Sequence, residues 1–303
     1  MRRKTRWPIL LLLTGCATNP GTPPPSAVYR LPDSVVALDA ADGRRIDANE
    51  LLTRLASADI ALLGELHDNA LHHEVRGGLL AALTSSRPAV VFEQFFESAS
   101  PIAAPEAGRA TEEWLDRNGF DRESWKWPLH RPIVDASIRY AGGLWGSGIS
   151  REALRSVIGG GESAAPPHLR AFLEQAPLDA PGIATLDREL VEGHCGQLPE
   201  AMVPGMRAAQ TVRDAAMTRA LLNARASSGS AWLIAGNGHV RRDIAVPRLL
   251  RVTSPDLSVI VVGFVEQPAG GAEVSAETRA LYDLVVVTPR VERPDPCAAF
   301  RGR

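Results

Sequence analysis

Six short apolar runs, separated by segments with helical periodicity, constrain the fold of this chain most strongly. The apolar residues in most runs follow one another without alternation, as is typical of strands covered on both faces in a parallel sheet. The runs span residues 34–39, 59–65, 89–94, 230–237, 257–264 and 281–288. We therefore expect a sheet with most of its strands buried in the interior.

Helical patterns lie between these runs. Segment 47–58 follows the first run, and segment 70–85 follows the second with one apolar stripe formed by Leu71, Val75, Leu79, Leu80 and Leu83. Further helices are expected over 111–117, 132–141, 150–157, 183–192 and 199–227. The alternation predicts an α/β fold with a mostly parallel central sheet flanked by helices.

The stretch 99–228 is rich in helical patterns, with a short strand expected only around 143–145. We expect it to be a helical insertion over the carboxyl ends of the strands, and a separate helical subdomain is the alternative. The 270 residues from Ser34 to Arg303 are enough for one large domain. We expect one α/β domain over 34–303.

The N-terminus has the features of a secretory signal in residues 1–16. Its basic head and short apolar run (9–13) are too short to span a bilayer, and the ending "LLTGC" resembles a lipobox, which predicts lipidation at Cys16. Residues 17–33 are rich in Pro, Ser and Thr and are expected to form a flexible tether. The sequence thus predicts a lipid-anchored protein on the periplasmic side of the cell envelope, at the outer membrane.

Charge and cysteine content add two expectations. Without the four basic residues of the signal, 29 of the 33 basic residues remain against 35 acidic ones, a net charge near −6 that argues against a nucleic-acid partner. Apart from Cys16, the cysteines are Cys195 and Cys297. An even number of cysteines in an oxidising compartment predicts a disulfide between them. Metal ligation by the two cysteines is the weaker alternative, because no CxxC spacing occurs.

Polar residues follow three of the predicted strands. Glu65 and His67 follow the second run, Glu93 follows the third, and His239 follows the fourth. The carboxyl ends of neighbouring parallel strands face one crevice, so these side chains are expected to converge. Such a set could support hydrolysis, with His67 or His239 as general base or metal ligand, the two glutamates as orienting groups or ligands, and a divalent metal polarising a carbonyl. The alternative is a set of helix caps and salt bridges.

The turn after the second run carries further expectations. Gly64, Gly236 and Gly238 are expected to turn sharply out of their strands, with positive φ available to them. Asp68 is expected to be the N-cap of the next helix. His72 and His73 are adjacent on that helix and therefore point in different directions, so at most one of them faces the crevice.

The block 120–140 brings together the side chains that a haem pocket uses. It contains aromatic faces, a candidate axial ligand and a cation for the propionates, provided by Trp125, Trp127, His130, Arg131 and Tyr140. A packed structural corner is the alternative. The sequence contains no GxSxG, P-loop, GxGxxG or HExxH motif, which leaves serine-nucleophile, nucleotide-binding and zincin chemistry without support.

Four motifs in this order behind a lipobox carry a family resemblance. They are "LLGELHDNALHH", "VFEQF", "WKWPLHRPIVDASI" and "AGNGHVRRDIAVP". Together they resemble the ChaN-like family of bacterial haem-binding lipoproteins over residues 34–297. The resemblance implies haem as cofactor, a role in haem and iron uptake, a homodimer with the cofactor at the subunit contact, and outer-membrane uptake machinery as a partner.

The same family is similar to a wider superfamily that includes Tiki and TraB proteins and the erythromycin esterases. There a GExxH-like turn, a second glutamate and a late histidine carry the catalysis, which implies Glu65, His67, Glu93 and His239 here. This sequence departs from that spacing, because Glu65 and His67 are only two positions apart. It also has His130 where the resemblance predicts an aromatic residue in "WxxYRP".

We therefore expect a lipid-anchored haem-binding protein for haem or iron acquisition or storage. Its candidate haem contacts are His72, His73, Trp127, His130, Arg131 and Tyr140. The alternatives are a hydrolase of the same fold, metal-dependent or based on His and Glu, and a non-catalytic envelope interaction protein. An open cleft at the four crevice residues would favour the hydrolase.

Overall fold

The computed structural model describes residues 29–83, 86–295 and 297–298. The predicted signal 1–16, the lipidation site Cys16 and the predicted tether up to residue 28 lie outside this part of the chain. Tyr29 already packs on the domain, where its hydroxyl donates to the carbonyl of Val75 at 3.3 Å. Fixed contacts thus begin before Ser34, where we expected the folded structure to start.

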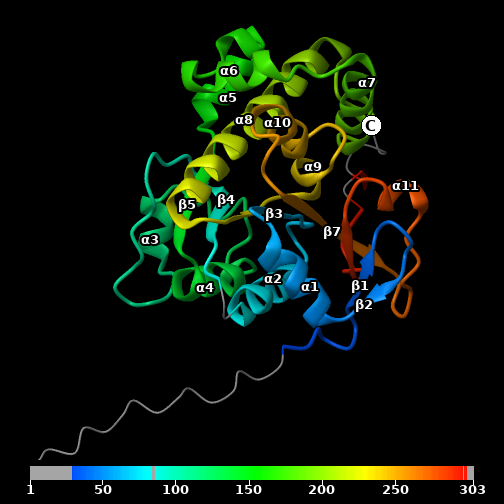
Figure 1. Cartoon of the computed structure of the whole chain (residues 1–303). Coiled ribbons are helices and arrows are strands. Elements are labelled where there is room, and N and C mark those ends of the chain that lie inside the picture. Colours follow the sequence, from blue (N-terminus) through cyan, green and yellow to red (C-terminus); the bar gives the residue numbers. More distant parts are fainter. Residues whose placement is uncertain (1–28, 84–85, 296, 299–303) are drawn as a thin grey trace, which may run out of the picture.

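An eight-stranded sheet forms the centre of the described part of the molecule, in the order β2-β1-β8-β7-β3-β6-β4-β5 (Figure 1). Neighbours from β8 to β5 are parallel, whereas β1 is antiparallel to both β8 and β2. This confirms the mostly parallel sheet. The strands are β1 (Val36–Asp39), β2 (Arg45–Ile46), β3 (Ile60–Leu63), β4 (Ala89–Phe96), β5 (Gly143–Gly148), β6 (Ala231–Ile234), β7 (Val259–Gln267) and β8 (Leu284–Pro289).

The apolar runs form these strands because both faces of the sheet are covered. In β3, Ala61 and Leu63 face one hydrophobic cluster, and Ile60 and Leu62 face the other. All four side chains are buried. The unbroken apolar pattern therefore follows from burial on two sides.

One face is covered by α1 (Ala48–Ser57), α2 (Ala70–Ala82), α3 (Glu112–Arg117) and α4 (Arg131–Tyr140). Helices α2 and α4 pack closely together. A Cβ atom at Gly77 of α2 would lie 2.8 Å from the carbonyl oxygen of Pro132, so glycine permits this approach. The contact fixes the start of α4 beside α2, and both carry candidate site residues.

The other face is covered by the long helix α8 (Val203–Ser228), which packs on β4, β5 and β6, together with α10 (Val246–Thr253). A further group packs on the outer side of α8 and lies at the top of Figure 1: α5 (Arg151–Gly160), α6 (Pro167–Gln175) and α7 (Ala180–Gly193). Short elements complete the fold, namely η1 (Glu162–Ala164), η2 (Glu200–Met202), α9 (Asn237–Val240) and α11 (Ala276–Arg279).

The segment 99–228 is mainly helical, as expected, and contributes to both faces of the sheet. Strand β5 confirms the short strand expected around 143–145. Helix α6, which starts at two prolines, was not among the expected helices. Proline is well tolerated in the first turn of a helix, where its missing N–H has no helical partner.

The predicted disulfide is present between Cys195 and Cys297, whose Cα atoms lie 5.6 Å apart. It joins the turn after α7 to the segment after β8, across a sequence separation of 102 residues. Within the described ranges, no helix is both long enough and apolar enough to cross a membrane.

Candidate functional site

The candidate residues gather at the carboxyl ends of β3, β4 and β6, but they form two clusters. Glu65 and His67 belong to the first cluster, and Glu93 and His239 belong to the second. The clusters meet at Gly236, whose N–H donates to Oε2 of Glu93 at 2.9 Å. A Cβ atom at Gly236 would lie 3.0 Å from Nε2 of His67, so the imidazole packs directly against this glycine.

Glu65 is the centre of the first cluster and is 1 % exposed. Its Oε1 lies 2.5 Å from Nδ1 of His67, 3.0 Å from Nε2 of Gln94 and 3.3 Å from Nε2 of His130. Its Oε2 binds the guanidinium of Arg76. Burial opposes the charged form, but Arg76, His130 and His67 together hold the pKa of Glu65 well below its usual range.

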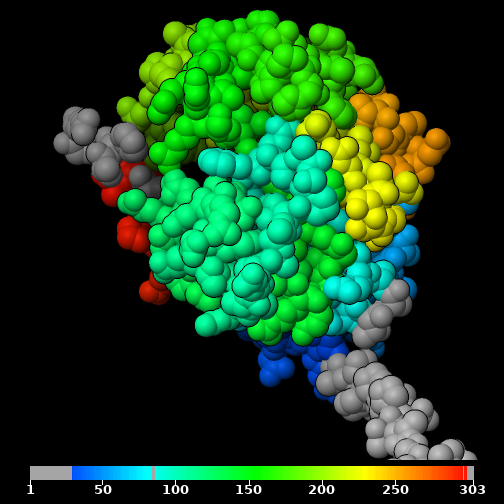
Figure 2. Space-filling model, turned by 90° about the vertical axis from the view of Figure 1, so that its left-hand side faces the viewer, coloured from blue at the N-terminus to red at the C-terminus, as the bar shows by residue number. Residues whose placement is uncertain are grey.

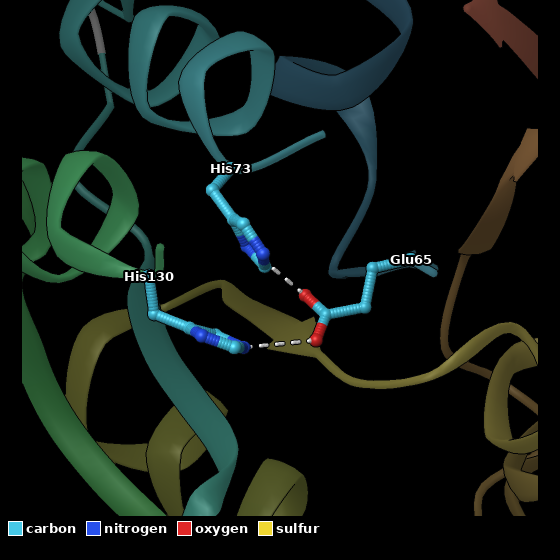
Figure 3. Close-up of side chains that lie close together, drawn as sticks. All are labelled: Glu65, His73 and His130. Atoms are coloured by element: carbon cyan, nitrogen blue, oxygen red, sulfur yellow. Dashed lines mark hydrogen bonds and ion pairs between the residues drawn. The ribbon is translucent and has the colours of Figure 1, made fainter. Parts of the chain in front are cut away.

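His73 reaches this carboxylate from α2, and His130 reaches it from the start of α4 (Figure 3). Nε2 of His73 lies 3.0 Å from the carbonyl oxygen of His67, so it carries the proton and donates. Nδ1 then accepts from Arg76 at 2.7 Å. Burial lowers the pKa of His73 to about 2, which agrees with a neutral ring fixed in one tautomer.

His72 points away from Glu65. Its Nδ1 accepts from the backbone N–H of Leu66 at 3.0 Å, and its Nε2 lies 2.8 Å from the hydroxyl of Thr288. Burial and the charge of Arg76 lower the pKa of His72 to about 3. This neutral ring ties the turn after β3 to β8, so of the two adjacent histidines only His73 reaches the cluster.

His130 is fully buried, and its ring centroid lies 4.0 Å from that of His73. Its Nδ1 is buried and has no hydrogen-bond partner among the described residues. The ring is enclosed by two aromatic neighbours, Phe120 and Trp125, at 5.8 and 6.0 Å. It therefore lies beneath the surface instead of lining it.

Glu65, His73 and His130 have ligand atoms within 4.8 Å of one another, the spacing of a metal site. A bound cation would have to share this space with Arg76, whose guanidinium already contacts both Glu65 and His73. Two cations in such contact repel strongly at low dielectric. The residues as arranged do not fit a divalent metal, because Arg76 already neutralises the carboxylate.

His67 differs from the other histidines of the cluster because 43 % of its side chain is exposed. Its ring centroid lies 4.9 Å from that of Trp125 in an edge-to-face contact. Burial disfavours its charged form, but the hydrogen bond to Glu65 and the charges of Glu93 and Glu65 raise its pKa. Its Nε2 makes no hydrogen bond within the described part of the chain.

The second cluster contains a residue that sequence reasoning missed. Nδ1 of His239 lies 2.7 Å from Oδ1 of Asp214 on α8, and its Nε2 lies 3.6 Å from Oε1 of Glu93. Burial opposes the protonated form, yet Glu93 and Asp214 raise the pKa of His239. Burial raises the pKa of Asp214. The sequence did offer a signal for Asp214, because it is a charged residue on the sheet-facing side of the predicted helix 199–227.

Two expectations about the turns are wrong. Gly64, Gly236 and Gly238 do not adopt positive φ. Gly64 is needed for close approach instead, because a Cβ atom there would collide with Oδ1 of Asn237. Asp68 is not the N-cap of α2: Asn69 caps it by accepting from Leu71 N–H at 3.0 Å, and Asp68 pairs with Arg293 at 2.9 Å.

The remaining haem candidates are spread along α4 and the loop before it. The guanidinium of Arg131 lies 4.8 Å from the ring centroid of Trp127, and both side chains are half-buried near the start of α4. Tyr140 is exposed at the other end of α4, where its carbonyl accepts from Arg87 at 3.2 Å. The structure therefore does not bring Tyr140 to the cluster.

Two hollows are lined by neighbours of the cluster residues. The first, of about 230 Å³, contains Glu93, Gln94 and Trp125 and opens between α5 and the segment after α3 (Figure 2). The second is a groove of about 740 Å³ that begins at Leu66 and Asn237. Its other lining residues are Phe264, Val265, Glu266, Arg290, Val291, Glu292 and Arg293.

This arrangement defines a three-layer α/β protein with a buried carboxylate and histidine centre beneath one exposed imidazole. Residues 51–250 match the model of the family described as haem-binding uptake, Tiki superfamily, ChaN. The chain therefore belongs to this haem-binding family. The family assignment confirms the resemblance, and it supports haem as the cofactor.

A solved structure supports the same fold. The match to ChaN of Campylobacter jejuni, a structure with cofacial haem binding, has a TM-score of 0.67 and 18 % identity, and covers 85 % of this chain and 98 % of that one. The type III effector HopBA1 is more distant, with a TM-score of 0.43, 13 % identity and coverage of 80 % and 93 %. No curated protein matches this chain significantly.

Proposed function

We propose that this chain binds haem in the groove that begins at Leu66 and Asn237, and that it serves haem or iron acquisition or storage at the cell envelope. The observation that carries the proposal is the groove of about 740 Å³ at the carboxyl ends of the strands, together with the family to which the chain belongs. Ligand sites of roughly 300–1,000 Å³ are typical of drug-sized molecules, and they favour this end of a parallel sheet.

The groove fits the chemistry of haem. Leu66, Val265 and Val291 supply apolar surface for the macrocycle. Arg290 lies at the same groove and can pair with a propionate, whereas Arg293 is already paired with Asp68 and Glu266. When bound, haem supplies an iron centre for ligand exchange or electron transfer, and the protein supplies the walls, the cations and an axial ligand. Trp127 and Arg131 provide a second aromatic and cationic surface near the start of α4.

The hydrolase alternative receives less support from the geometry. Glu65 is 1 %, His239 8 % and Glu93 9 % exposed, so three of the four crevice residues offer little surface to a substrate. The pair of His239 and Asp214 could orient an imidazole for proton transfer, but Glu93 faces the other ring nitrogen. We therefore prefer a binding function.

The envelope location is part of the proposal and is supported by the N-terminal sequence. The order of basic head, apolar run and "LLTGC" fits a lipoprotein anchored through Cys16 on the periplasmic face of the outer membrane. The disulfide between Cys195 and Cys297 is consistent with an oxidising compartment. A homodimer and outer-membrane uptake machinery would complete this function as partners.

A hemin titration tests the function. The full-length chain carrying Cys16→Ala, purified without lipid, is titrated with ferric hemin, and a Soret shift that saturates at a defined stoichiometry is expected. Arg290→Glu should weaken binding severalfold, whereas Arg44→Glu, which lies outside the groove, should not. Absence of a saturable shift overturns the haem function.

The anchor is tested separately in cell fractions. The unmodified chain should fractionate with the outer membrane, and the Cys16→Ala chain should be released into the soluble periplasmic fraction. Equal distribution of the two chains would contradict lipidation at Cys16.

A further inference from the structure

We infer that the hollow of about 230 Å³ at the carboxyl end of β4 binds a free α-amino acid with an apolar side chain. The ammonium group of this ligand would be held by Glu93 and Gln94, and its carboxylate by Arg213. The hollow opens between α5 and the segment after α3 (Figure 2). The inference does not rest on the haem function, because this hollow and the haem groove share no lining residue.

Gln94 provides the observation that points to a ligand. Its side chain is 2 % exposed and lines the hollow, and its Nε2 donates to Oε1 of Glu65 at 3.0 Å. Its Oε1 is buried and has no hydrogen-bond partner among the described residues. If the amide were turned round, Oε1 would face the carboxylate of Glu65, which cannot donate. Buried acceptors without a partner are rare and costly, so a donor on a ligand accounts for this oxygen.

Glu93 provides a negative charge at the same hollow. Its Oε2 accepts from the N–H of Gly236 at 2.9 Å, whereas its Oε1 accepts no hydrogen bond within the described ranges. Nε2 of His239 lies 3.6 Å from Oε1, but Asp214 at the other ring nitrogen offsets the charge of His239. Glu93 is 9 % exposed, and opposite charges attract more strongly at low dielectric than in water. Its carboxylate is therefore suited to a ligand ammonium group.

An irregularity in β4 brings both acceptors to one hollow. In a regular strand, neighbouring side chains point to opposite faces of the sheet. The register of β4 with β5 shifts between Phe92 and Phe96. Glu93 and Gln94 lie within this shift, and both line the hollow. Gly148 of β5 permits the close approach, because a Cβ atom there would lie 2.8 Å from the carbonyl oxygen of Glu93. Bulges that redirect side chains in this way are common beside functional sites.

Arg213 of α8 provides a positive charge at the hollow. Its side chain is half-buried, and its Nη1 donates to Oε1 of Gln210 at 3.5 Å. Within the part of the chain that the structure describes, it takes part in no ion pair. The other cation of the lining, Arg151, is already paired with Asp121. Arginine binds carboxylates through two parallel hydrogen bonds, so Arg213 is suited to the carboxylate of a ligand.

The lining as a whole favours a zwitterion. Its charged residues are two carboxylates and two guanidinium groups, so it presents both signs of charge and no net charge. Apolar surface for a side chain comes from Trp125, Ile149, Leu154 and Met217. The volume of about 230 Å³ lies below the roughly 300–1,000 Å³ of sites for drug-sized ligands, which limits the occupant to a small molecule. A free amino acid the size of leucine meets these conditions.

Calorimetric titration of the full-length chain carrying Cys16→Ala tests the site with three probes of one carbon skeleton at neutral pH. They are L-leucine, isopentylamine, which lacks the carboxylate, and isocaproate, which lacks the ammonium group. Leucine should bind at a one-to-one ratio and about tenfold or more tightly than either analogue, because each analogue loses a set of charged hydrogen bonds. Absence of leucine binding, or equal affinity for either analogue, overturns the amino-acid site.

Two variants test the charged groups one at a time. Arg213→Gln should weaken leucine binding about tenfold and abolish the preference for leucine over isopentylamine, which has no carboxylate for Arg213 to bind. Glu93→Gln should likewise abolish the preference for leucine over isocaproate. Arg207→Gln changes another half-buried arginine of α8, outside the hollow, and should leave the affinity for leucine unchanged.

The outcomes keep this site separate from folding and from haem. Equal urea midpoints of the parent and Arg213→Gln show that a loss of binding is not caused by unfolding. If Arg213→Gln and Glu93→Gln both retain the preferences of the parent, leucine binds elsewhere and the inference is wrong. A chain that binds hemin but not leucine keeps the haem function and loses this site, and a chain that binds leucine but not hemin shows the reverse.

Discussion

Arg76 binds the carboxylate of Glu65 in the interior of the protein, and neither side chain is exposed to solvent. The guanidinium also donates to the carbonyl of His72 at 3.1 Å and contacts Nδ1 of His73 at 2.7 Å. The ion pair thus connects the turn after β3 to α2. The ion pair also fixes the carboxylate of Glu65, which orients the imidazole of His67.

Breaking this pair should destabilise the protein strongly. Arg76→Met leaves Glu65 as a buried charge without its cation, and removing one partner of a buried pair typically costs about 3–5 kcal/mol. The free energy of unfolding from urea denaturation measures the effect. The double variant Arg76→Met with Glu65→Gln should recover part of the loss, because it removes the unpaired charge.

A matched control uses an exposed ion pair. Arg44 binds Glu50 at 2.8 Å on the surface, where solvent screens the interaction, so Arg44→Met should leave the urea midpoint nearly unchanged. Equal losses for Arg44→Met and Arg76→Met would contradict the role of the buried pair.

The two neutral histidines of α2 predict acid sensitivity. Their pKa values are about 3 for His72 and about 2 for His73, below the ordinary value of 6.5. Below pH 6.5 the unfolded chain binds protons that the folded chain does not, so stability falls as pH falls. Each histidine should contribute a slope of about 1.4 kcal/mol per pH unit between pH 6 and 4.

His72→Gln should remove one of these slopes, and urea denaturation at several pH values measures it. His67 and His239 have raised pKa values, so their contribution is present below pH 6.5 and is lost as pH rises through their folded pKa. They therefore affect stability above pH 6.5 and do not add to the acid slope. An unchanged acid slope in His72→Gln would show that His72 becomes protonated in the fold.

The fold was predictable from the sequence because its determinants are local. An unbroken apolar run such as 59–65 becomes a strand buried on two faces, and the stripe with Val75 and Leu79 becomes the inner face of α2. Helices α6 and α10 were not predicted because they are short and start with prolines, and proline in the first turn resembles a loop signal.

The site was predictable only in its position. The ends of β3, β4 and β6 meet as the parallel topology requires. The partners of the polar residues come from distant elements, however: Asp214 from α8 and Arg76 from the buried face of α2. A sequence pattern does not show which buried charges pair, and so the division into two clusters was not foreseen.

The disulfide should stabilise the folded chain against unfolding. In the chain-entropy model a closed loop of about 100 residues contributes about 4–5 kcal/mol, which applies to the separation of 102 between Cys195 and Cys297. Dithiothreitol should therefore lower the urea midpoint of the Cys16→Ala chain. The same chain carrying Cys195→Ser and Cys297→Ser should start at that lower midpoint and show no response to dithiothreitol.

Asn237 links the turn after β6 to β7. Because its side chain packs against Gly64, we expect substitutions at these two positions to have coupled effects on stability. Its Nδ2 donates to the carbonyl of Phe264 at 2.6 Å, and its Oδ1 accepts from the N–H of Phe264 at 3.1 Å. Gly64→Ala would force a methyl group into Oδ1 and into the side chain of Val240, a form of overpacking that costs about 1–3 kcal/mol. Asn237→Ala loses both hydrogen bonds and is destabilising by itself.

The double variant Gly64→Ala with Asn237→Ala should lose less stability than the sum of the losses in the single variants. The reason is that Asn237→Ala removes the Oδ1 atom with which the methyl group of Gly64→Ala would collide. A thermodynamic cycle from urea denaturation of the four proteins measures this coupling. Gly159→Ala is the matched control, since a Cβ atom there meets nothing within 4 Å. Strict additivity would show that the turn at Gly64 relaxes independently of Asn237.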